Sequence, residues 1–219
     1  MSYTLLHGPT LHAEAPYTFF LPHPWLVGAV RVGDLVKLGF EYDPPGEKYG
    51  GERMWVEVDR VEGDDYAGHI VNEPDEPILT FGEVVSFKRD NILDVLLVDA
   101  ARLPEFHTDA GRVPQVQQSR EYWERCFVDD CVLYDGVPVE YLYRETPEKL
   151  ENDEYPDSGW RIRGRQGEAT DDEMDAREVS FVALGAVLNK DDSWLHLIDA
   201  PIGSRFMRNF ESGSYEMAD

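Results

Sequence analysis

The side chains that most often carry out enzyme chemistry form no recognisable set in this sequence. No two of its six histidines lie four residues apart around a glutamate, the spacing that binds zinc on a peptidase helix. Neither cysteine, Cys126 or Cys131, has a histidine nearby in the sequence, which leaves only a spatial partner to activate it. Phosphate-binding glycine loops and the Gly-x-Ser-x-Gly motif are absent. We therefore predict no catalytic residue, no metal and no cofactor, and we expect a protein that is not an enzyme.

Acidic residues dominate the composition. The sequence has 44 Asp and Glu against 20 Lys and Arg, a net charge of -24 at pH 7. With so many carboxylates, no pair can be singled out for acid–base catalysis. The acidic run at residues 171–175 also lacks the glycine and the final glutamate of a calcium loop. A surface of this charge repels nucleic acid and anionic membranes and attracts a basic protein.

The chain is expected to fold and to stay in the cytoplasm. Of its 219 residues, 42% are hydrophobic and 12% aromatic, which suffices for a sizeable core. Its first residues lack the pattern of a signal peptide, and no apolar run approaches the ~18 residues that span a membrane. Without an export signal, the two cysteines are expected to be reduced thiols.

One basic feature contrasts with this acidic background. Arg161, Arg163 and Arg165 alternate along a predicted strand, so their side chains should project from one face, next to Trp160. They either pair with acidic residues on neighbouring strands or form a recognition surface, because Trp and Arg are enriched at interface hot spots.

Hydrophobic patterning predicts mainly strands. Residues 34–89 indicate a curled antiparallel sheet of about four strands, with a hairpin turn at residues 62–65 and a Pro/Gly-rich excursion at residues 43–51. Residues 92–98 fit either a helical turn or a closing strand. In the second half we expect a helix from Gln115 to about Cys126.

Further elements follow that helix. A hairpin is expected to join residues 131–134 and 137–143 through an Asp-Gly turn, and a strand is expected at residues 159–163. Residues 164–178 should form an acidic loop, and the apolar residues 179–188 should be buried.

Together these elements predict an α+β fold with two small antiparallel-sheet units packed together, each with one or two short helices. The predicted domains are residues 15–100 and 114–208. Residues 101–113 would link them, and residues 209–219 would form a frayed tail.

Three segments of the second half occur in a familiar order: VEYLYRE at 139–145, DSGWR at 157–161 and LIDAPIGSRFMR at 197–208. Through these three segments, the region of residues 126–208 resembles a family of small bacterial proteins called immunity protein thirty-three. The acidic loop at 164–178 departs from the family pattern. The resemblance implies a cytosolic protein that protects its own cell by binding the toxin of a polymorphic toxin system.

The first half has a second resemblance. Residues 17–97, through VGDLVKL at 32–38, ERMWVEV at 52–58 and GHIVNEP at 68–74, resemble an uncharacterised bacterial domain of the YegJ type. This resemblance implies no chemistry.

The sequence therefore predicts an acidic cytoplasmic protein that neutralises a cognate, basic protein toxin by direct binding. The alternative is a small-ligand-binding or hydrolytic domain without a recognisable motif. The predicted binding surface lies around segments 157–161 and 199–205, and its partner-binding residues are Asp157, Trp160, Arg161, Arg163, Asp199 and Arg205. For Trp160 a core role is slightly favoured, and for the three arginines an interface role, because charged groups are seldom buried without partners.

Overall fold

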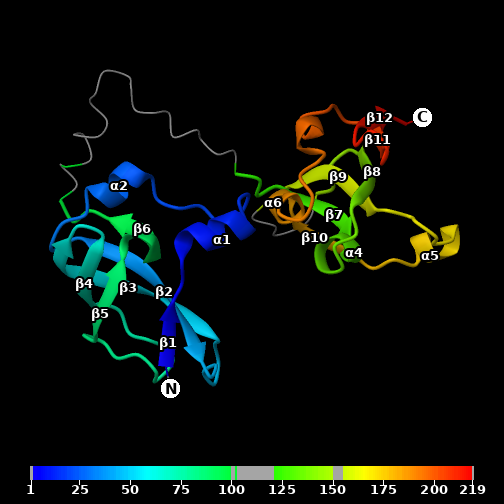
Figure 1. Cartoon of the computed structure of the whole chain (residues 1–219). Helices are drawn as coiled ribbons and strands as arrows, with labels where there is room; N and C mark the ends of the chain where they lie inside the picture. Colours follow the sequence, from blue (N-terminus) through cyan, green and yellow to red (C-terminus); the bar gives the residue numbers. More distant parts are fainter. Residues whose placement is uncertain (1, 100–101, 103–120, 150–154, 219) are drawn as a thin grey trace. The chain divides into compact units, whose positions relative to one another are not determined.

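The computed structural model describes residues 2–99, 102, 121–149 and 155–218. The chain divides into two compact units, Met1–Ser119 and Arg120–Asp219, and each is built around one sheet (Figure 1). Both units combine strands with short helices, so the predicted α+β class is confirmed.

The first unit contains a curled antiparallel sheet. Its order is β1-β2-β3-β4-β5, and β6 pairs with residues 35–38 of β2, beyond the residues that pair with β1. The predicted sheet is thus confirmed and extended by two strands, β1 and β6. Its elements are β1 (Ser2–Leu5), α1 (Gly8–Glu14), α2 (Pro24–Gly28), β2 (Leu35–Asp43), β3 (Gly51–Glu62), β4 (Asp65–Ile70), β5 (Val84–Lys88), η1 (Arg89–Asn91) and β6 (Ile92–Leu96).

Two buried carboxylates hold the loops of the first unit. Asp34 accepts hydrogen bonds from Arg102 Nη1 at 2.8 and 2.9 Å and from the backbone N–H of Val98 at 3.1 Å. The Glu76 carboxylate accepts hydrogen bonds from the backbone N–H groups of residues 47–49. These hydrogen bonds order the segment between β2 and β3. Those hydrogen bonds, the one from Lys48 above all, lower the pKa of Glu76.

The second unit contains a mixed sheet of order β10-β7-β9-β8-β11-β12. The prediction of a purely antiparallel sheet is wrong here, because β7 and β9 run parallel. The elements are β7 (Arg125–Asp129), α4 (Asp130–Tyr134), β8 (Val139–Arg144), β9 (Asp157–Gly164), α5 (Asp171–Asp175), β10 (Val179–Ala183), α6 (Leu184–Leu188), η3 (Leu195–Leu197), β11 (Arg205–Arg208) and β12 (Tyr215–Met217).

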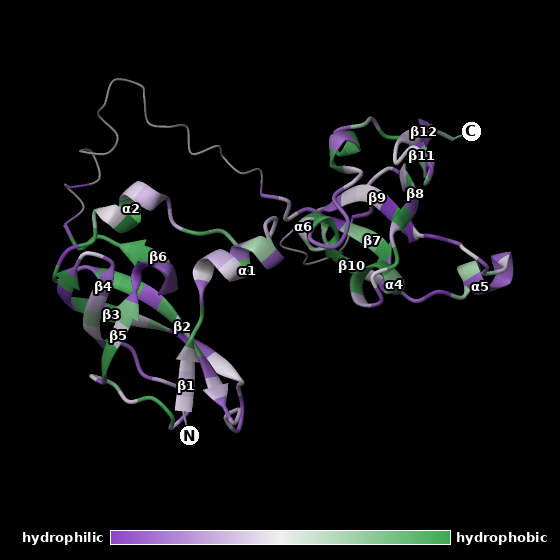
Figure 2. Cartoon of the chain, viewed as in Figure 1, coloured by the Kyte–Doolittle hydropathy of each residue, from purple (hydrophilic) through white to green (hydrophobic). Residues whose placement is uncertain are grey.

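One face of this second sheet is covered. Trp160 has no exposed surface; its ring packs 5.8 Å from that of Trp194, and its Nε1–H donates to the carbonyl of Ile198. Further along β9, Gly164 lies so close to α4 that an added Cβ would stand 3.1 Å from Val132. Figure 2 shows hydrophobic residues along β7 and α6, in contrast to the hydrophilic α5. The covered face is therefore the core of the second unit.

Three further predictions for the second half are wrong. Residues 125 and 126 belong to β7 and not to a helix, because buried Cys126 and Val128 alternate with less buried neighbours; residues 115–120 of the predicted helix lie outside the described part. Residues 131–134 form α4, and Gly136, at φ 68°, follows the helix as its C-terminal cap, where a hairpin was expected. The predicted linker, except for Arg102, also lies outside the described residues.

The third error concerns the expected frayed tail. Residues 215–217 form β12, which pairs with β11. Tyr215 anchors this strand, because its hydroxyl lies 3.0 Å from Ser193 Oγ and donates to the carbonyl of Val139.

We predict that Tyr215→Ala lowers the free energy of unfolding by about 1.5–3 kcal/mol, because the substitution removes a half-buried aromatic ring and its hydrogen bonds. Met217→Ala is the matched control on the same strand, since Met217 is 80% exposed. Denaturant unfolding of both variants tests the assignment, and equal stability of the two would show that β12 does not support the fold.

Candidate functional site

The open face of the second sheet carries two rows of side chains that cross the strands. In the first row the paired positions are Phe181, Phe127, Arg161, Tyr143 and Arg205, each on the strand next to the one before. The second row contains Asp129, Arg163, Tyr141 and Met207. Successive residues of a strand point to opposite faces, so these side chains lie opposite the core residues Trp160 and Leu142. We call these nine residues the open face.

Arg161 is the centre of the first row and is buried. Its guanidinium forms two hydrogen bonds with Asp157, at 3.0 and 2.9 Å, and stands 4.6 Å from the centroid of the Phe127 ring. The carboxylates of Glu145 and Glu148 lie 3.2 and 3.7 Å away. This arginine therefore supports the neighbouring residues of the row and offers little surface to a partner.

Asp157 completes this buried ion pair. Its carboxylate accepts hydrogen bonds from Arg161 and also from the backbone N–H groups of Glu148 and Gly159, both at 2.9 Å. Burial alone would raise the pKa of Asp157, but the hydrogen bonds from Arg161 and the two N–H groups outweigh it and hold the pKa below its usual value. The carboxylate is thus ionised at neutral pH.

The second row has its own buried carboxylate. Asp129, whose side chain is not exposed, lies 2.8 Å from Nε of Arg163 and 3.2 Å from Nη1 of Arg177. Arg163 also donates to the carbonyl of Met174, which ties α5 and its loop to the edge of the open face. The charge of Arg163 is therefore largely compensated within the unit.

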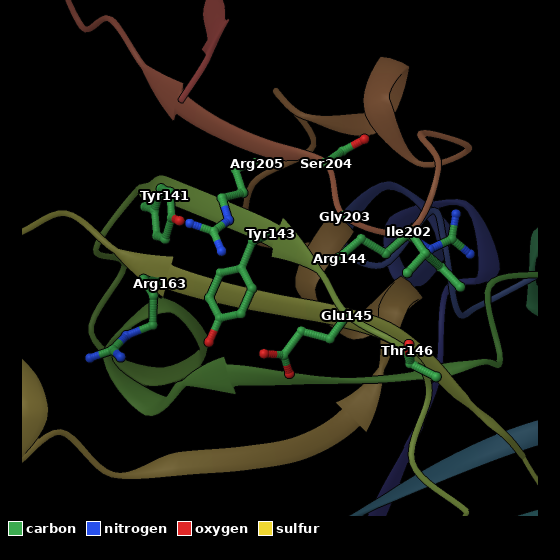
Figure 3. Close-up of a pocket in the computed structure, with 10 residues that line it drawn as sticks. All are labelled: Tyr141, Tyr143, Arg144, Glu145, Thr146, Arg163, Ile202, Gly203, Ser204 and Arg205. Carbon is green, nitrogen blue, oxygen red and sulfur yellow. The ribbon is translucent and has the colours of Figure 1, made fainter. Parts of the chain in front are cut away.

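A hollow of about 600 Å³ opens between β8, β9 and the start of β11 (Figure 3). The aromatic rings of Tyr141 and Tyr143 lie in it, with centroids 5.5 Å apart. Burial, followed by the charge of Glu145, raises the pKa of Tyr143, so its hydroxyl keeps its proton and remains a donor. The lining residues are Tyr141, Tyr143, Arg144, Glu145, Thr146, Arg163, Ile202, Gly203, Ser204 and Arg205.

The arginines around this hollow differ in how their charges are used. Arg144 turns away from it: the guanidinium donates to the carbonyls of Ser158 and Ala200 and stands 5.7 Å from the centroid of the Trp160 ring. Arg205 is exposed, and within the described chain its side chain makes no hydrogen bond or ion pair. Arg205 is thus the cation of this hollow that is available to a ligand.

The structure separates the six predicted partner-binding residues into four groups. Arg163 and Arg205 line the hollow, whereas Asp157 and Arg161 form a buried ion pair. Trp160 belongs to the core, the role favoured for it, and a side chain without exposed surface cannot touch a partner. Asp199 is exposed in the loop after η3 and is not among the residues that line the hollow.

Sequence reasoning missed the aromatic and apolar part of the surface. Tyr141 and Tyr143 flank buried Leu142, and Met207 follows buried Phe206, so an alternation of period two was present in both strands. That alternation marks which residues share a face, but it does not reveal that β8 lies between β9 and β11, which brings Tyr143 beside Arg205.

The described residues offer little support for nucleophilic or metal chemistry. Burial raises the pKa of both Cys126 and Cys131, which keeps the thiols protonated. No group of three His, Cys, Asp or Glu in the described ranges is placed to hold a metal ion. Nor does any helix in the described part have the length and apolar character needed to cross a membrane.

Comparison with known proteins gives one match. Residues 126–218 match the family model described as Immunity protein Imm33 domain. The resemblance read from the second half of the sequence is thereby confirmed, and the matched region extends through β12. No curated protein and no solved structure matches the chain, and no match supports the YegJ-type resemblance of the first half.

The buried ion pair leads to a stability prediction. Arg161→Ala should lower the free energy of unfolding by about 3–5 kcal/mol, because it leaves the Asp157 carboxylate buried without its cation. Arg205→Ala should change it by less than about 0.5 kcal/mol, since Arg205 is exposed and makes no ion pair among the described residues. Denaturant unfolding of both variants tests this, and a mild effect at Arg161 would contradict the supporting role.

A pH prediction follows from Asp157. Because its pKa is lower in the folded than in the unfolded state, where it is about 3.9, its contribution to stability is present above about pH 4 and is lost as the pH falls through the folded pKa. The free energy of unfolding of the wild type should therefore fall more steeply between pH 5 and pH 2 than that of Asp157→Asn. Parallel curves for the two proteins would contradict the assignment.

Proposed function

We propose that this chain is an immunity protein that neutralises the toxin of a polymorphic toxin system by binding it directly through the open face. The observation that carries the proposal is the match of residues 126–218 to an immunity protein domain. The open face and the residues that line the hollow lie entirely within this matched region.

The chemistry of the open face supports protein binding. Tyr, Met and Arg are enriched where proteins bind one another, because these side chains combine apolar area with a polar group. Tyr141, Tyr143 and Arg163 are partly exposed, and Met207 and Ile202 are 45% and 56% exposed. A surface of this kind can bury apolar area and still satisfy polar groups on a partner.

The charge of the chain supports a basic toxin as the partner. A net charge of -24 creates a field that attracts a positively charged domain and accelerates its association. The same field disfavours nucleic acid and anionic membranes as partners. In this account the protein meets the toxin inside its own cell.

The hollow favours a second candidate function, the binding of a small ligand. About 600 Å³ lies within the range of small-molecule sites, and the tyrosine hydroxyls and Arg205 could orient a polar molecule. A ligand that copurifies with the chain and occupies the hollow would support this alternative.

We predict that Tyr143→Ala weakens binding of the toxin domain about 10- to 1000-fold, because Tyr143 lies between Arg161 and Arg205 in the first row and its truncation removes a hot-spot aromatic. The test combines isothermal titration calorimetry, using an inactive variant of the cognate toxin domain, with a protection assay in cells that express the active toxin.

Tyr134→Ala is the matched control for this experiment. Tyr134 is 72% exposed at the end of α4, which packs on the covered face. This variant should bind and protect like the wild type. Equal loss of binding in both variants, or none in either, would rule out the open face as the binding surface.

A further inference from the structure

Arg205 has an exposed guanidinium at the edge of the hollow. Several arginines in the described residues pair with carboxylates, among them Arg60 with Glu62, Arg89 with Asp64 and Arg208 with Asp191. Arg205 has no such partner within the described part, although the chain has 44 acidic residues. Its guanidinium therefore leaves a strong donor group unused beside the hollow.

The groups around Arg205 are donors as well. The hydroxyls of Tyr141 and Tyr143 line the same hollow, and neither has a hydrogen-bond partner in the described part of the chain. The Ser204 hydroxyl is a further lining group. Figure 3 shows the guanidinium of Arg205 directed toward the two tyrosines. The hollow thus gathers donor groups that lack an acceptor.

Glu145, the acidic residue that lines the hollow, does not serve as the acceptor for these donors. Glu145 lies 3.2 Å from Nε of Arg161, so its charge is already paired with the buried arginine. Arg163 is likewise paired, with Asp129. Arg144, the remaining lining arginine, uses its guanidinium on the carbonyls of Ser158 and Ala200. Arg205 is thus the lining arginine whose guanidinium has no internal acceptor in the described part of the chain.

From this arrangement we propose that the hollow binds a carboxylate side chain of the protein partner, with Arg205 as its anchor. This inference rests on the proposed function and specifies the chemistry of the contact. A planar guanidinium binds a carboxylate through two parallel hydrogen bonds, and the tyrosine hydroxyls can donate to the same oxygens. An aspartate or glutamate of the partner would thus enter between Tyr143 and Arg205.

A carboxylate contact is compatible with a basic toxin. The net charge of the whole chain acts over a distance and guides a positively charged domain toward the protein, whereas Arg205 acts only on contact and fixes the orientation. An acidic side chain within a basic surface would then distinguish the cognate toxin from other basic proteins.

The test measures the affinity of the full-length chain for the inactive toxin domain by isothermal titration calorimetry. We expect Arg205→Glu to weaken binding at least 100-fold and Arg205→Lys about tenfold, because lysine keeps the charge but loses the two-pronged contact. The matched control is Lys190→Glu, which changes the net charge equally at an exposed residue just after α6. It should weaken binding by no more than about threefold.

A charge swap then identifies the partner group. In the toxin domain, each aspartate and glutamate is changed in turn to arginine, and one of these variants should recover at least tenfold in affinity for Arg205→Glu. Equal effects of Arg205→Glu and Lys190→Glu, an unaffected Arg205→Glu or no rescue would overturn the carboxylate contact while leaving the immunity function intact. If the wild type does not bind the toxin domain, the proposed function itself fails and this inference fails with it.

Discussion

The second unit depends on the buried ion pair between Asp157 and Arg161. The pair lies at the centre of the sheet, where it connects β9 to β7 through the Phe127 ring and to the segment after β8 through Glu145 and the N–H of Glu148. Gly159 is required beside it, since it adopts φ 83° and an added Cβ would stand 2.2 Å from the carbonyl oxygen of Glu145. A buried charge pair is costly to desolvate, so its value lies in the backbone and side-chain geometry that it fixes.

That geometry separates structural charges from available ones. Arg161, Arg163 and Arg144 use their guanidinium groups on internal acceptors, whereas Arg205 presents its own to solvent. The charged residues of the open face are thus three arginines and Asp129, and Arg161 and Arg163 are both paired with buried carboxylates. Long-range attraction and short-range recognition are thus assigned to different groups, an arrangement that combines fast association with specificity.

The sequence predicted the fold class because alternating patterns such as that of β3 depend only on neighbouring residues. It failed where distant pairing decides the outcome. The parallel pairing of β7 with β9 and the pairing of β12 with β11 are set by tertiary contacts, such as those of Tyr215 with Ser193 and Val139. The alternation of Arg161 and Arg163 predicted that they share a face of β9, but it could not show that Arg161 has a buried carboxylate four residues earlier.

The central claim is that a protein partner covers the open face, and hydroxyl-radical footprinting of the full-length chain with and without the toxin domain tests it most directly. Tyr and Met side chains react readily with these radicals, and the chain offers matched residues inside and outside the face. The account predicts that Tyr141, Tyr143 and Met207 become protected in the complex, whereas Tyr134 and Met217, which are 72% and 80% exposed, keep their reactivity. Unchanged oxidation of Met207 and both tyrosines in a formed complex, or protection confined to Tyr134 and Met217, would contradict it.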